Sequence, residues 1–464
     1  MALTILCVSF TLLLLLGVPV AFSIGLSSLA TILYEGLPLA VGFQQMISGM
    51  NPFSFLAIPF FIFAGEIMMY GGIADRIVTF AKSLAGHVRG GLGMSNVLAC
   101  TLFGGVSGSP VADVSAMGAV LIPQMKKEGY HADYAVNVTT HASLVGALMP
   151  TSHNLIIFAL AAGGKVSIAA LILAGIVPAV LLTVCNLLAA YLVAVKRGYP
   201  AGTFPGWEIV WISFKASVPG LAVVVIIIAG ILSGAFTATE SASVAVVWAL
   251  FLSAIVYRRL TREQFLKAAA KAVKTTGTVL LLIGISSMFG YLIGLYGVAE
   301  LTADALRSFS TTPWVIFLCV NVILFVLGTF LDMAATILIC TPIFLPICQQ
   351  FGMTTEQFGI VMLINCALGL NTPPVGTTQF IGCTIAGISE DHLALLRRPH
   401  RGARAGHLRS VVLDVAAQPD PEDRLIASRG EAERRFYGWV SRAPARFFLG
   451  AASRCCFICC GELA

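Results

Sequence analysis

The sequence predicts an all-α integral membrane protein built as an inverted repeat, with two re-entrant hairpins and two broken helices. Three observations predict this fold class. The 464-residue chain is 58% hydrophobic and only 11% charged, whereas about 25% of the residues of soluble domains are charged. An interrupted apolar segment occurs once in each half of the chain, and the charged loop that precedes it changes sign between the two copies.

Long apolar runs supply the membrane spans. They cover residues 4–34, 168–194, 217–233, 240–257 and 312–330, and they reach or approach the roughly 20 residues that a helix needs to cross a bilayer. The N-terminal run lacks the Lys or Arg of a signal-peptide n-region. We therefore expect it to be a retained first span rather than a cleaved signal.

The repeated segment is interrupted by Gly, Pro, Ser and Thr in both copies. The first copy reads NVLACTLFGGVSGSPVADVSAMGAVLIPQM and the second NVILFVLGTFLDMAATILICTPIFLPIC. A constant offset of 223 residues places Pro123 on Pro346, Gly129 on Gly352, Gly146 on Gly369 and Pro150 on Pro373. Breaks in apolar segments are tolerated in a bilayer only where the freed backbone groups face protein or a water-filled cavity. Paired breaks in the two halves are the best sequence indication of the binding site of a secondary transporter.

Charged loops predict the orientation, because Lys and Arg in short loops mark the cytoplasmic side. Loops 195–198 and 257–276 are basic and lie two spans apart, so both are expected in the cytoplasm. Loop 71–91 is also basic, whereas its counterpart 297–311 is acidic. The first hairpin, 92–124, should therefore enter from the cytoplasm and the second, 312–347, from the periplasm. Segment 217–233 would be the helix that reverses the second unit.

These features predict five stretches along the chain. They are scaffold and arm helices of the first repeat (1–91), its hairpin and broken helix as transport elements (92–163), scaffold helices with a cytoplasmic linker (164–277), the transport elements of the second repeat (278–392), and an anomalous Arg-rich tail (393–464).

The tail does not complete the second repeat. Symmetry demands an apolar span there, mirroring 168–194, but the tail holds twelve Arg, no Lys and seven acidic residues. We interpret it as out-of-frame translation or an assembly error, and a genuine basic cytoplasmic extension is the alternative. Its terminal cysteines form one CxxC without a second ligand pair, so no metal site is expected there.

No catalytic constellation and no phosphate-binding loop is visible, so we expect neither an enzyme nor ATP hydrolysis by this chain, and nothing indicates nucleic-acid binding. The four breaks carry the polar groups instead. They are Gly104, Gly105, Ser107, Gly108, Ser109 and Pro110; Pro150, Thr151, Ser152 and Asn154; Gly328, Thr329, Asp332, Thr336 and Thr341; and Asn371, Thr372, Pro373, Pro374, Gly376 and Thr377. Carbonyls and hydroxyls at the C-terminal ends of half-helices suit sodium, and the N-terminal ends suit a carboxylate. The alternative is a set of structural kinks, which four breaks in register between two repeats disfavour.

Ionisable residues within spans are functional candidates. Asp113 and Asp332 each lie close to a hairpin tip. Glu66 lies near the end of span 55–70 and is either functional or interfacial. Glu240 has a structural interpretation, because it follows Thr237 at the spacing of a capping box that opens the next helix.

The motifs resemble those of the large membrane subunit of TRAP transporters, the tripartite ATP-independent periplasmic family, of the DctM type. They are FFIFAGEIMMYGGIADRI, FGGVSGSPVADVSAMG, GAFTATESASVAVV, LGTFLDMAATILICTPIFLPI and LGLNTPPVGTTQF, and the resemblance covers residues 1–392. The family usually has Pro where Ala238 stands and often a second Pro where Thr151 stands. Its final helix is absent here.

The resemblance implies an ion-transporter-type fold of the elevator type in the bacterial inner membrane. It implies sodium-driven import of an organic anion such as a C4-dicarboxylate or a sugar acid, with Na⁺ as coupling ion and no resident cofactor. Two partners are implied, a small four-helix membrane subunit (DctQ-type) and a soluble periplasmic substrate-binding protein (DctP-type). Carried over by position, one sodium site falls on Ser107, Gly108 and Pro110 with Thr151, Ser152 and Asn154, and the other on Gly328 and Asp332 with Asn371, Thr372 and Pro373. The substrate would lie between them, near Ser109, Asp113, Thr336 and Thr377.

Two other functions remain open. The first is a stand-alone sodium–dicarboxylate symporter of the same broad fold, which neighbouring genes for a binding protein and a small subunit would argue against. The second is a channel, although no ring-forming filter motif is present.

The tail yields the first testable prediction. Reading the gene in all three frames after about codon 388 should reveal one further apolar span, because an inverted repeat needs a counterpart to 168–194. We expect the 464-residue chain to assemble poorly. If no frame encodes such a span and the chain transports normally, the frameshift interpretation is wrong.

Overall fold

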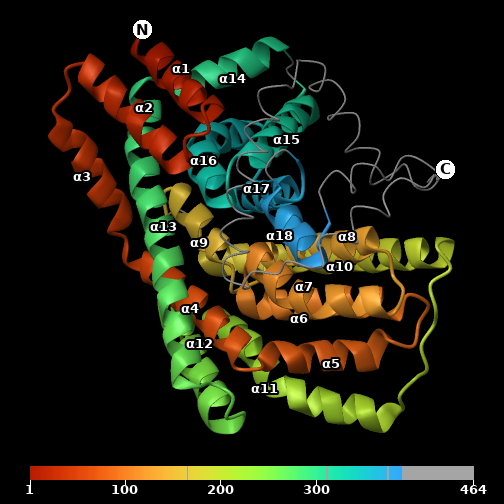
Figure 1. Ribbon diagram of the computed structural model, residues 1–464. Helices are drawn as coiled ribbons and strands as arrows, with labels where there is room; N and C mark the ends of the chain where they lie inside the picture. The colour runs from red at the N-terminus through yellow and green to blue at the C-terminus, as the bar shows by residue number, and fades with distance from the viewer. Residues whose placement is uncertain (165, 310–311, 374–375, 389–464) are drawn as a thin grey trace, which may run out of the picture. The chain divides into compact units, whose positions relative to one another are not determined.

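The computed structural model describes residues 1–464 except 165, 310–311, 374–375 and 389–464 (Figure 1). The described part is helical throughout, apart from one isolated bridge between Arg89 and Ala201. Seven of its helices are long and apolar enough to cross a membrane, or eight if one bent pair counts as a span. The prediction of an all-α membrane protein is confirmed. The predicted Arg-rich tail lies outside the described residues.

The first half contains ten α-helices and two short 3-10 turns. They are α1 Ala2–Leu15, α2 Val20–Tyr34, α3 Leu39–Met50, η1 Phe53–Leu56, α4 Ala57–Tyr70, α5 Ile73–Ala85, α6 Gly91–Ser107, α7 Pro110–Lys127, α8 Ala132–Ser143, η2 Leu144–Leu148, α9 His153–Ala161 and α10 Ile168–Lys196. Helices α6 and α7 form the first hairpin. Helices α8 and α9 are bent by 50° at the break between them, which confirms the first broken helix.

The second half repeats this order as far as the described residues extend. It contains α11 Trp207–Leu232, α12 Ala238–Leu250 with a π-helical end η3 Phe251–Val256, α13 Arg262–Leu295, α14 Val298–Phe309, α15 Pro313–Phe330, α16 Met333–Gln350, α17 Thr355–Leu370 and α18 Thr377–Ala386. Helices α15 and α16 form the second hairpin, and α17 and α18 are the halves of the second broken helix (Figure 1).

The helix boundaries confirm the repeat. The 223-residue offset carries both ends of α7 onto both ends of α16, and the first residue of α8 onto the first residue of α17. Gly129 and Gly352, which end the hairpins, both adopt a left-handed backbone with φ of 85° and 89°. Glycine adopts this conformation without the steric penalty that a Cβ would bring.

The offset also relates the long arms that precede the hairpins. It carries the start of α3 onto the start of α13, but α13 continues for 34 residues where the first repeat is interrupted between α3 and α4. The interruption contains Pro52, which lacks the N–H that a continuous helix needs and disfavours a helical residue before it. The two arms lie against each other, since α13 contacts both α3 and α4.

Three expectations about connecting segments are corrected. The single span expected over 4–34 is two shorter helices, α1 and α2, because Gly17 with φ of 78° and Pro19 separate them. The basic segment expected as a loop over 257–276 is helical from Arg262 onward, since Thr261 and Gln264 form a capping box there. The segments 71–91 and 297–311 each contain an amphipathic helix, α5 and α14.

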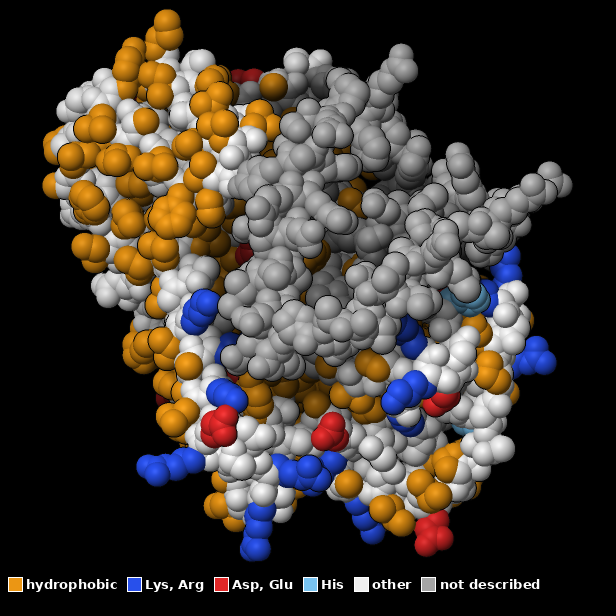
Figure 2. Space-filling model, viewed as in Figure 1, with side chains coloured by type: hydrophobic (Ala, Val, Ile, Leu, Met, Phe, Trp, Pro, Cys, Tyr) orange, Lys and Arg blue, Asp and Glu red, His pale blue; other side chains and the backbone are white. Residues whose placement is uncertain are grey.

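Exposed side chains are distributed as a bilayer requires. Hydrophobic side chains such as Leu15, Phe22 and Ile47 cover the surface of α1, α2 and α3, where Figure 2 shows no Lys or Arg. In the same view Lys and Arg gather toward the end at which α13 begins. This separation agrees with the positive-inside interpretation of the basic loops.

Glycines allow each hairpin to cross its broken helix at backbone distance. A Cβ on Gly104 would lie 2.9 Å from the Cα of Gly146, and one on Gly369 would lie 2.8 Å from the Cα of Gly328. One polar bond beside each crossing joins the same two helices. The Asn96 amide donates to Thr139 Oγ1 at 2.6 Å, and the Asn365 amide donates to Asn321 Oδ1 at 2.6 Å.

Replacement of one crossing glycine tests this packing. We expect Gly369→Ala to lower the thermal unfolding midpoint, because an added methyl overpacks the backbone contact with Gly328 at about 1–3 kcal/mol. Gly290→Ala on α13 is the matched control, since its Cβ would meet nothing within 4 Å. Equal melting midpoints for the two purified variants in the same detergent would contradict the crossing.

Candidate functional site

The first hairpin tip is a two-residue connection between α6 and α7. Gly108 has φ of 64° in the left-handed region, and a Cβ there would lie 2.6 Å from the backbone nitrogen of Ser152. Ser109 caps α7 by accepting a hydrogen bond from the Ala112 N–H at 3.5 Å, and Pro110 occupies the first turn. Both residue types favour a helix start. The tip therefore lies directly against the break of the first broken helix.

The first break is held to the hairpin by a side chain. Thr151 Oγ1 donates to the carbonyl of Gly105 at 3.1 Å, so it satisfies one of the carbonyls freed at the end of α6. Thr151, Ser152 and Asn154 are all buried. The structure thus brings together the two groups of residues expected at the first sodium site.

Asp113 belongs to the same cluster. It is fully buried in the first turn of α7, and its Oδ1 accepts a hydrogen bond from Ser107 Oγ. Its Oδ2 lies at the crossing, 2.8 Å from where a Cβ of Gly104 would stand. Among the described residues, neither Asp113 Oδ2 nor Ser152 Oγ has a hydrogen-bond partner. The Asp113 carboxyl, expected near the substrate, thus bonds Ser107 at the hairpin tip and lies beside Gly104 and Gly146 at the crossing.

The second tip is built with a different cap. Asp332 precedes α16, and its Oδ2 accepts a hydrogen bond from the Ala334 N–H at 3.2 Å. Thr336 Oγ1 donates to the Asp332 carbonyl at 3.0 Å, within the same turn. Gly328 contacts the broken helix through Gly369. These bonds fix the start of α16, as the cap at Ser109 fixes the start of α7.

The second break contains the largest group of unpaired polar atoms. Thr378 closes it, since its hydroxyl is within hydrogen-bond distance of the Leu370 carbonyl, at 2.7 Å, and of Asn371 Oδ1. Asn371 Nδ2, Thr377 Oγ1 and Gln379 Oε1 are buried atoms without partners among the described residues. Thr378 and Gln379 were not among the residues expected from the sequence, although both follow the NTPPVG break within one helical turn.

One other residue expected at the second break forms a local hydrogen bond, and another lies outside the described residues. Thr372 Oγ1 donates back to the Leu368 carbonyl at 2.9 Å. Pro373 is described, but Pro374 lies outside the described residues. No cluster of three or more His, Cys, Asp or Glu occurs in the described part of the chain. The oxygen atoms at the breaks are mainly carbonyl, hydroxyl and amide groups, which suit a hard monovalent cation.

Glu240 and Glu66 each interact with a neighbouring side chain. Glu240 and Thr237 form a complete capping box at the start of α12, which confirms that interpretation. Glu66 is buried on α4 and forms an ion pair with Lys271 of α13, with Nζ and Oε1 2.9 Å apart. It therefore joins the two arms. Its neighbour Gly65 faces the first tip, since a Cβ there would lie 3.5 Å from the Cα of Ser107.

The sequence model of the family described as tripartite ATP-independent periplasmic transporter, DctM component, matches residues 7–402. The chain belongs to this family. The uncharacterized protein YgiK of Salmonella typhimurium is 42% identical over 386 residues, which cover 82% of this chain and 88% of that protein. The sialic acid TRAP transporter large permease SiaM of Vibrio cholerae is 36% identical over 377 residues, covering 81% and 88%. The C4-dicarboxylate TRAP transporter large permease DctM of Rhodobacter capsulatus is 32% identical over 394 residues, covering 82% and 89%.

Membership of the DctM family identifies the class of this protein. The DctM-family chain is a TRAP transporter large permease and a multi-pass protein of the bacterial inner membrane. The relatives SiaM and DctM are both named as TRAP transporter large permeases. The resemblance noted from the motifs is confirmed.

Substitutions at the breaks test the candidate site. We expect Asn371→Ala and Ser109→Ala each to weaken transport more than Glu240→Gln does. Asn371→Ala should raise the sodium concentration for half-maximal uptake about tenfold, the equivalent of one lost hydrogen bond or ligand. The measurement is uptake into proteoliposomes at varied sodium concentration.

Glu240→Gln is the control for these substitutions, because Glu240 belongs to an exposed cap. It should leave the sodium requirement unchanged. A raised sodium requirement in Glu240→Gln at normal expression would contradict the assignment of function to the breaks.

Proposed function

We propose that this permease couples an inward sodium gradient to the import of an organic anion with a carboxylate group. The substrate would be delivered by a soluble periplasmic binding protein, and a small four-helix membrane subunit would complete the transporter. The observation that carries the proposal is that the helix breaks of both repeats contain buried polar side-chain atoms without partners, five of the thirteen such atoms among the described residues.

The sodium ions would be bound where half-helices end. In the first repeat Asp113 Oδ2 and Ser152 Oγ are unpaired beside the C-terminal end of α6. That helix end carries partial negative charge, as does the C-terminal end of α17 beside Asn371. An unpaired buried carboxylate oxygen is costly unless a cation or a proton compensates it, so a bound ion accounts for the arrangement at Asp113.

The substrate carboxylate would interact with the opposite ends of the half-helices. Helices α7, α9, α16 and α18 begin at the breaks, and each presents N–H groups without helical partners and a partial positive charge. Ser109, Thr336 and Thr377 lie in the first turns of three of them or at their caps. The named relatives support an acid as substrate, since one is a sialic acid permease and another a C4-dicarboxylate permease.

The hairpins and broken helices would move as one transport domain against the remaining scaffold. The helix contacts support this grouping, because the hairpin of each repeat contacts the broken helix of the other repeat. Helix α7 of the first hairpin contacts α18, and α16 of the second hairpin contacts α9. A rigid unit made in this way can slide along the arm helix α4, where Gly65 meets the first tip without a side chain. An elevator motion is the corresponding mechanism.

A stand-alone sodium–dicarboxylate symporter remains the second candidate. The helix breaks suit both transporters equally, so the binding protein decides between them. Family membership favours the multi-component transporter, because the family description names one component of a tripartite system.

The energy source gives the decisive experiment. Radiolabelled sialic acid and succinate serve as substrates for proteoliposomes that contain this subunit with the products of neighbouring partner genes. We expect uptake with an inward sodium gradient and none with choline in place of sodium on both sides. The reason is that bound sodium would supply the missing partner of the unpaired oxygen atoms at the helix breaks. Added ATP should have no effect. Undiminished uptake without sodium would overturn the coupling, and uptake without the binding protein would favour the stand-alone symporter.

A further inference from the structure

Two pockets outside the helix breaks occupy equivalent positions in the two repeats. The α7–α18 pocket, of about 320 Å³, is lined by Pro123, Lys126, Lys127 and Ile385. The α9–α16 pocket, of about 280 Å³, is lined by residues that include Ala162, Pro346 and Gln349. The 223-residue offset carries Pro123 onto Pro346, Lys126 onto Gln349 and Ala162 onto Ile385. Each pocket therefore lies between the second helix of one hairpin and the end of the other repeat's broken helix.

The α7–α18 pocket contains its own cation. Lys126 Nζ donates to the carbonyl of Ala386, the last residue of α18, at 2.6 Å. An ammonium group at the C-terminal end of a helix is stabilised by the partial negative charge of the free carbonyls. The same residue links the first hairpin to the second broken helix.

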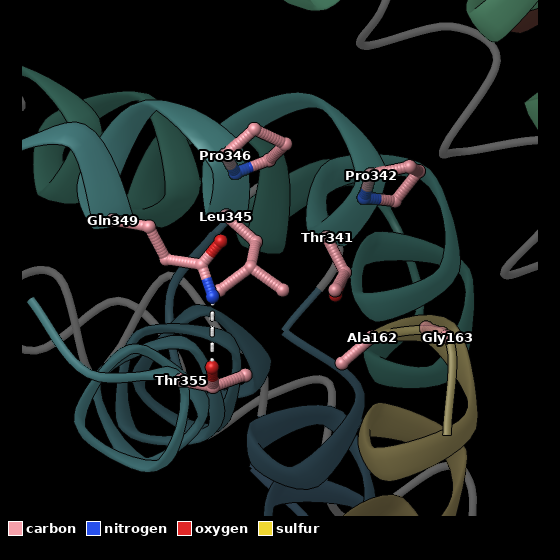
Figure 3. A pocket seen from close by; sticks show the side chains of 9 residues that line it. Ala162, Gly163, Thr341, Pro342, Leu345, Pro346, Gln349 and Thr355 are labelled. Atoms are coloured by element: carbon pink, nitrogen blue, oxygen red, sulfur yellow. Dashed lines mark hydrogen bonds between the residues drawn. The ribbon is translucent and has the colours of Figure 1, made fainter. Parts of the chain in front are cut away.

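The α9–α16 pocket presents the same helix end without that cation. Gly163, the counterpart of Ala386 under the offset, follows α9 and lines the pocket. Gln349 replaces the lysine, and its Nε2 donates to Thr355 Oγ1 at 2.9 Å (Figure 3). This bond leaves Oε1 as the free acceptor of the amide. None of the pocket's lining residues is charged, and Arg307, on α14, is bonded to the neighbouring Gln350.

Thr341 provides an independent indication of a ligand. It is 0% exposed, lines the pocket, and its Oγ1 has no hydrogen-bond partner among the described residues. Figure 3 shows the side chain between α16 and Ala162, with its oxygen directed toward α9. Buried helical threonines normally bond to a carbonyl one turn back, as Thr183 does at 2.8 Å. An unpaired buried hydroxyl requires a separate explanation.

The rest of the pocket suits a short aliphatic stem. Pro342, Leu345 and Pro346 form an apolar wall on α16 (Figure 3). Proline lacks an N–H, so Pro346 leaves the carbonyl of Pro342 without its helical donor. The pocket thus combines an apolar wall with acceptors at Thr341, Gln349 and the end of α9.

We propose that the α9–α16 pocket binds a primary ammonium group on a short aliphatic stem, which occupies the place that Lys126 fills in the other repeat. The stem contacts the proline–leucine wall, as lysine stems do on apolar surfaces. The ammonium group donates to Thr341 Oγ1, Gln349 Oε1 and the C-terminal carbonyls of α9. Thr341 lies eight residues beyond the first residue of α16, about 12 Å along the helix, so this site is separate from the tips. The occupant is a free amine or an ethanolamine lipid headgroup, which share this chemistry.

The test uses n-butylammonium as the probe and saturation-transfer NMR on the purified chain in detergent. The wild type should bind the probe and should not bind n-butanol, which has the stem without the charge. Gln349→Lys should reduce the affinity by at least about tenfold, because the new side chain fills the pocket as Lys126 does, and should raise the melting midpoint without the probe. No binding to the wild type, or equal binding to wild type and Gln349→Lys, would overturn the proposal.

A second pair of variants keeps the test decisive if Gln349→Lys does not fold. Thr341→Val removes the unpaired hydroxyl with little change in volume and should also weaken binding about tenfold. Thr384→Val, whose hydroxyl donates to the Phe380 carbonyl outside the pocket, should leave binding unchanged. Equal affinities for these two variants would contradict the role of Thr341.

Lipid nanodiscs identify the source of the amine. A higher melting midpoint in phosphatidylethanolamine than in phosphatidylglycerol, present in the wild type and lost in Gln349→Lys, assigns the pocket to the lipid headgroup. Binding of n-butylammonium without any lipid effect assigns it to a soluble amine. Failure of the wild type to bind n-butylammonium excludes the ammonium site whatever the lipid result.

Discussion

Every helix break within a bilayer leaves N–H and C=O groups without helical partners, and lipid offers none in exchange. This permease satisfies part of that demand by placing a hairpin tip against each break. Thr151 reaches back to the Gly105 carbonyl, and Thr378 closes the second break onto Leu370. The first glycine crossing makes the Thr151 bond geometrically accessible, because the hairpin and the broken helix approach at backbone distance. The Thr378 bond lies within the second broken helix itself.

The groups that remain unsatisfied define the candidate site more sharply than the breaks themselves do. Backbone N–H groups freed at the tips bond to local side chains. Ser109 and Asp332 accept such bonds at the starts of α7 and α16. Among the described residues, the buried polar atoms without a partner at the breaks are few, and they include Asp113 Oδ2 and Asn371 Nδ2. A polar atom held away from water without a partner destabilises the fold by about 1–3 kcal/mol. Its retention is explained when an ion or a substrate supplies the missing interaction.

Local patterns were sufficient to predict the all-helical class, both hairpins, both breaks and the offset between repeats. These features follow from runs of apolar residues and from the positions of Gly and Pro, whose effects on the backbone extend over one or two helical turns. The segment after Arg262 is polar enough to be taken for a loop, yet it is the first part of α13, because Thr261 and Gln264 form a capping box that starts the helix. The position of the Asp113 carboxyl, bonded to Ser107 and beside Gly146 of the broken helix, could not be predicted, since it depends on the angle at which the hairpin meets that helix.

Comparison of equivalent positions shows which parts of the repeat are fixed by geometry and which are free to differ. The offset places Ser109 on Asp332, and both residues cap the second helix of a hairpin. It places Asp113 on Thr336, so each hairpin has one carboxylate in its first turn or cap, but at different positions. In the first repeat this carboxylate lies within the glycine crossing, whereas in the second repeat Gly369 meets Gly328 and the carboxylate caps the helix instead. The same backbone frame therefore presents two electrostatically different tips. The repeat supplies a common backbone frame, and substitutions of this kind at equivalent positions supply the chemical difference between its two halves.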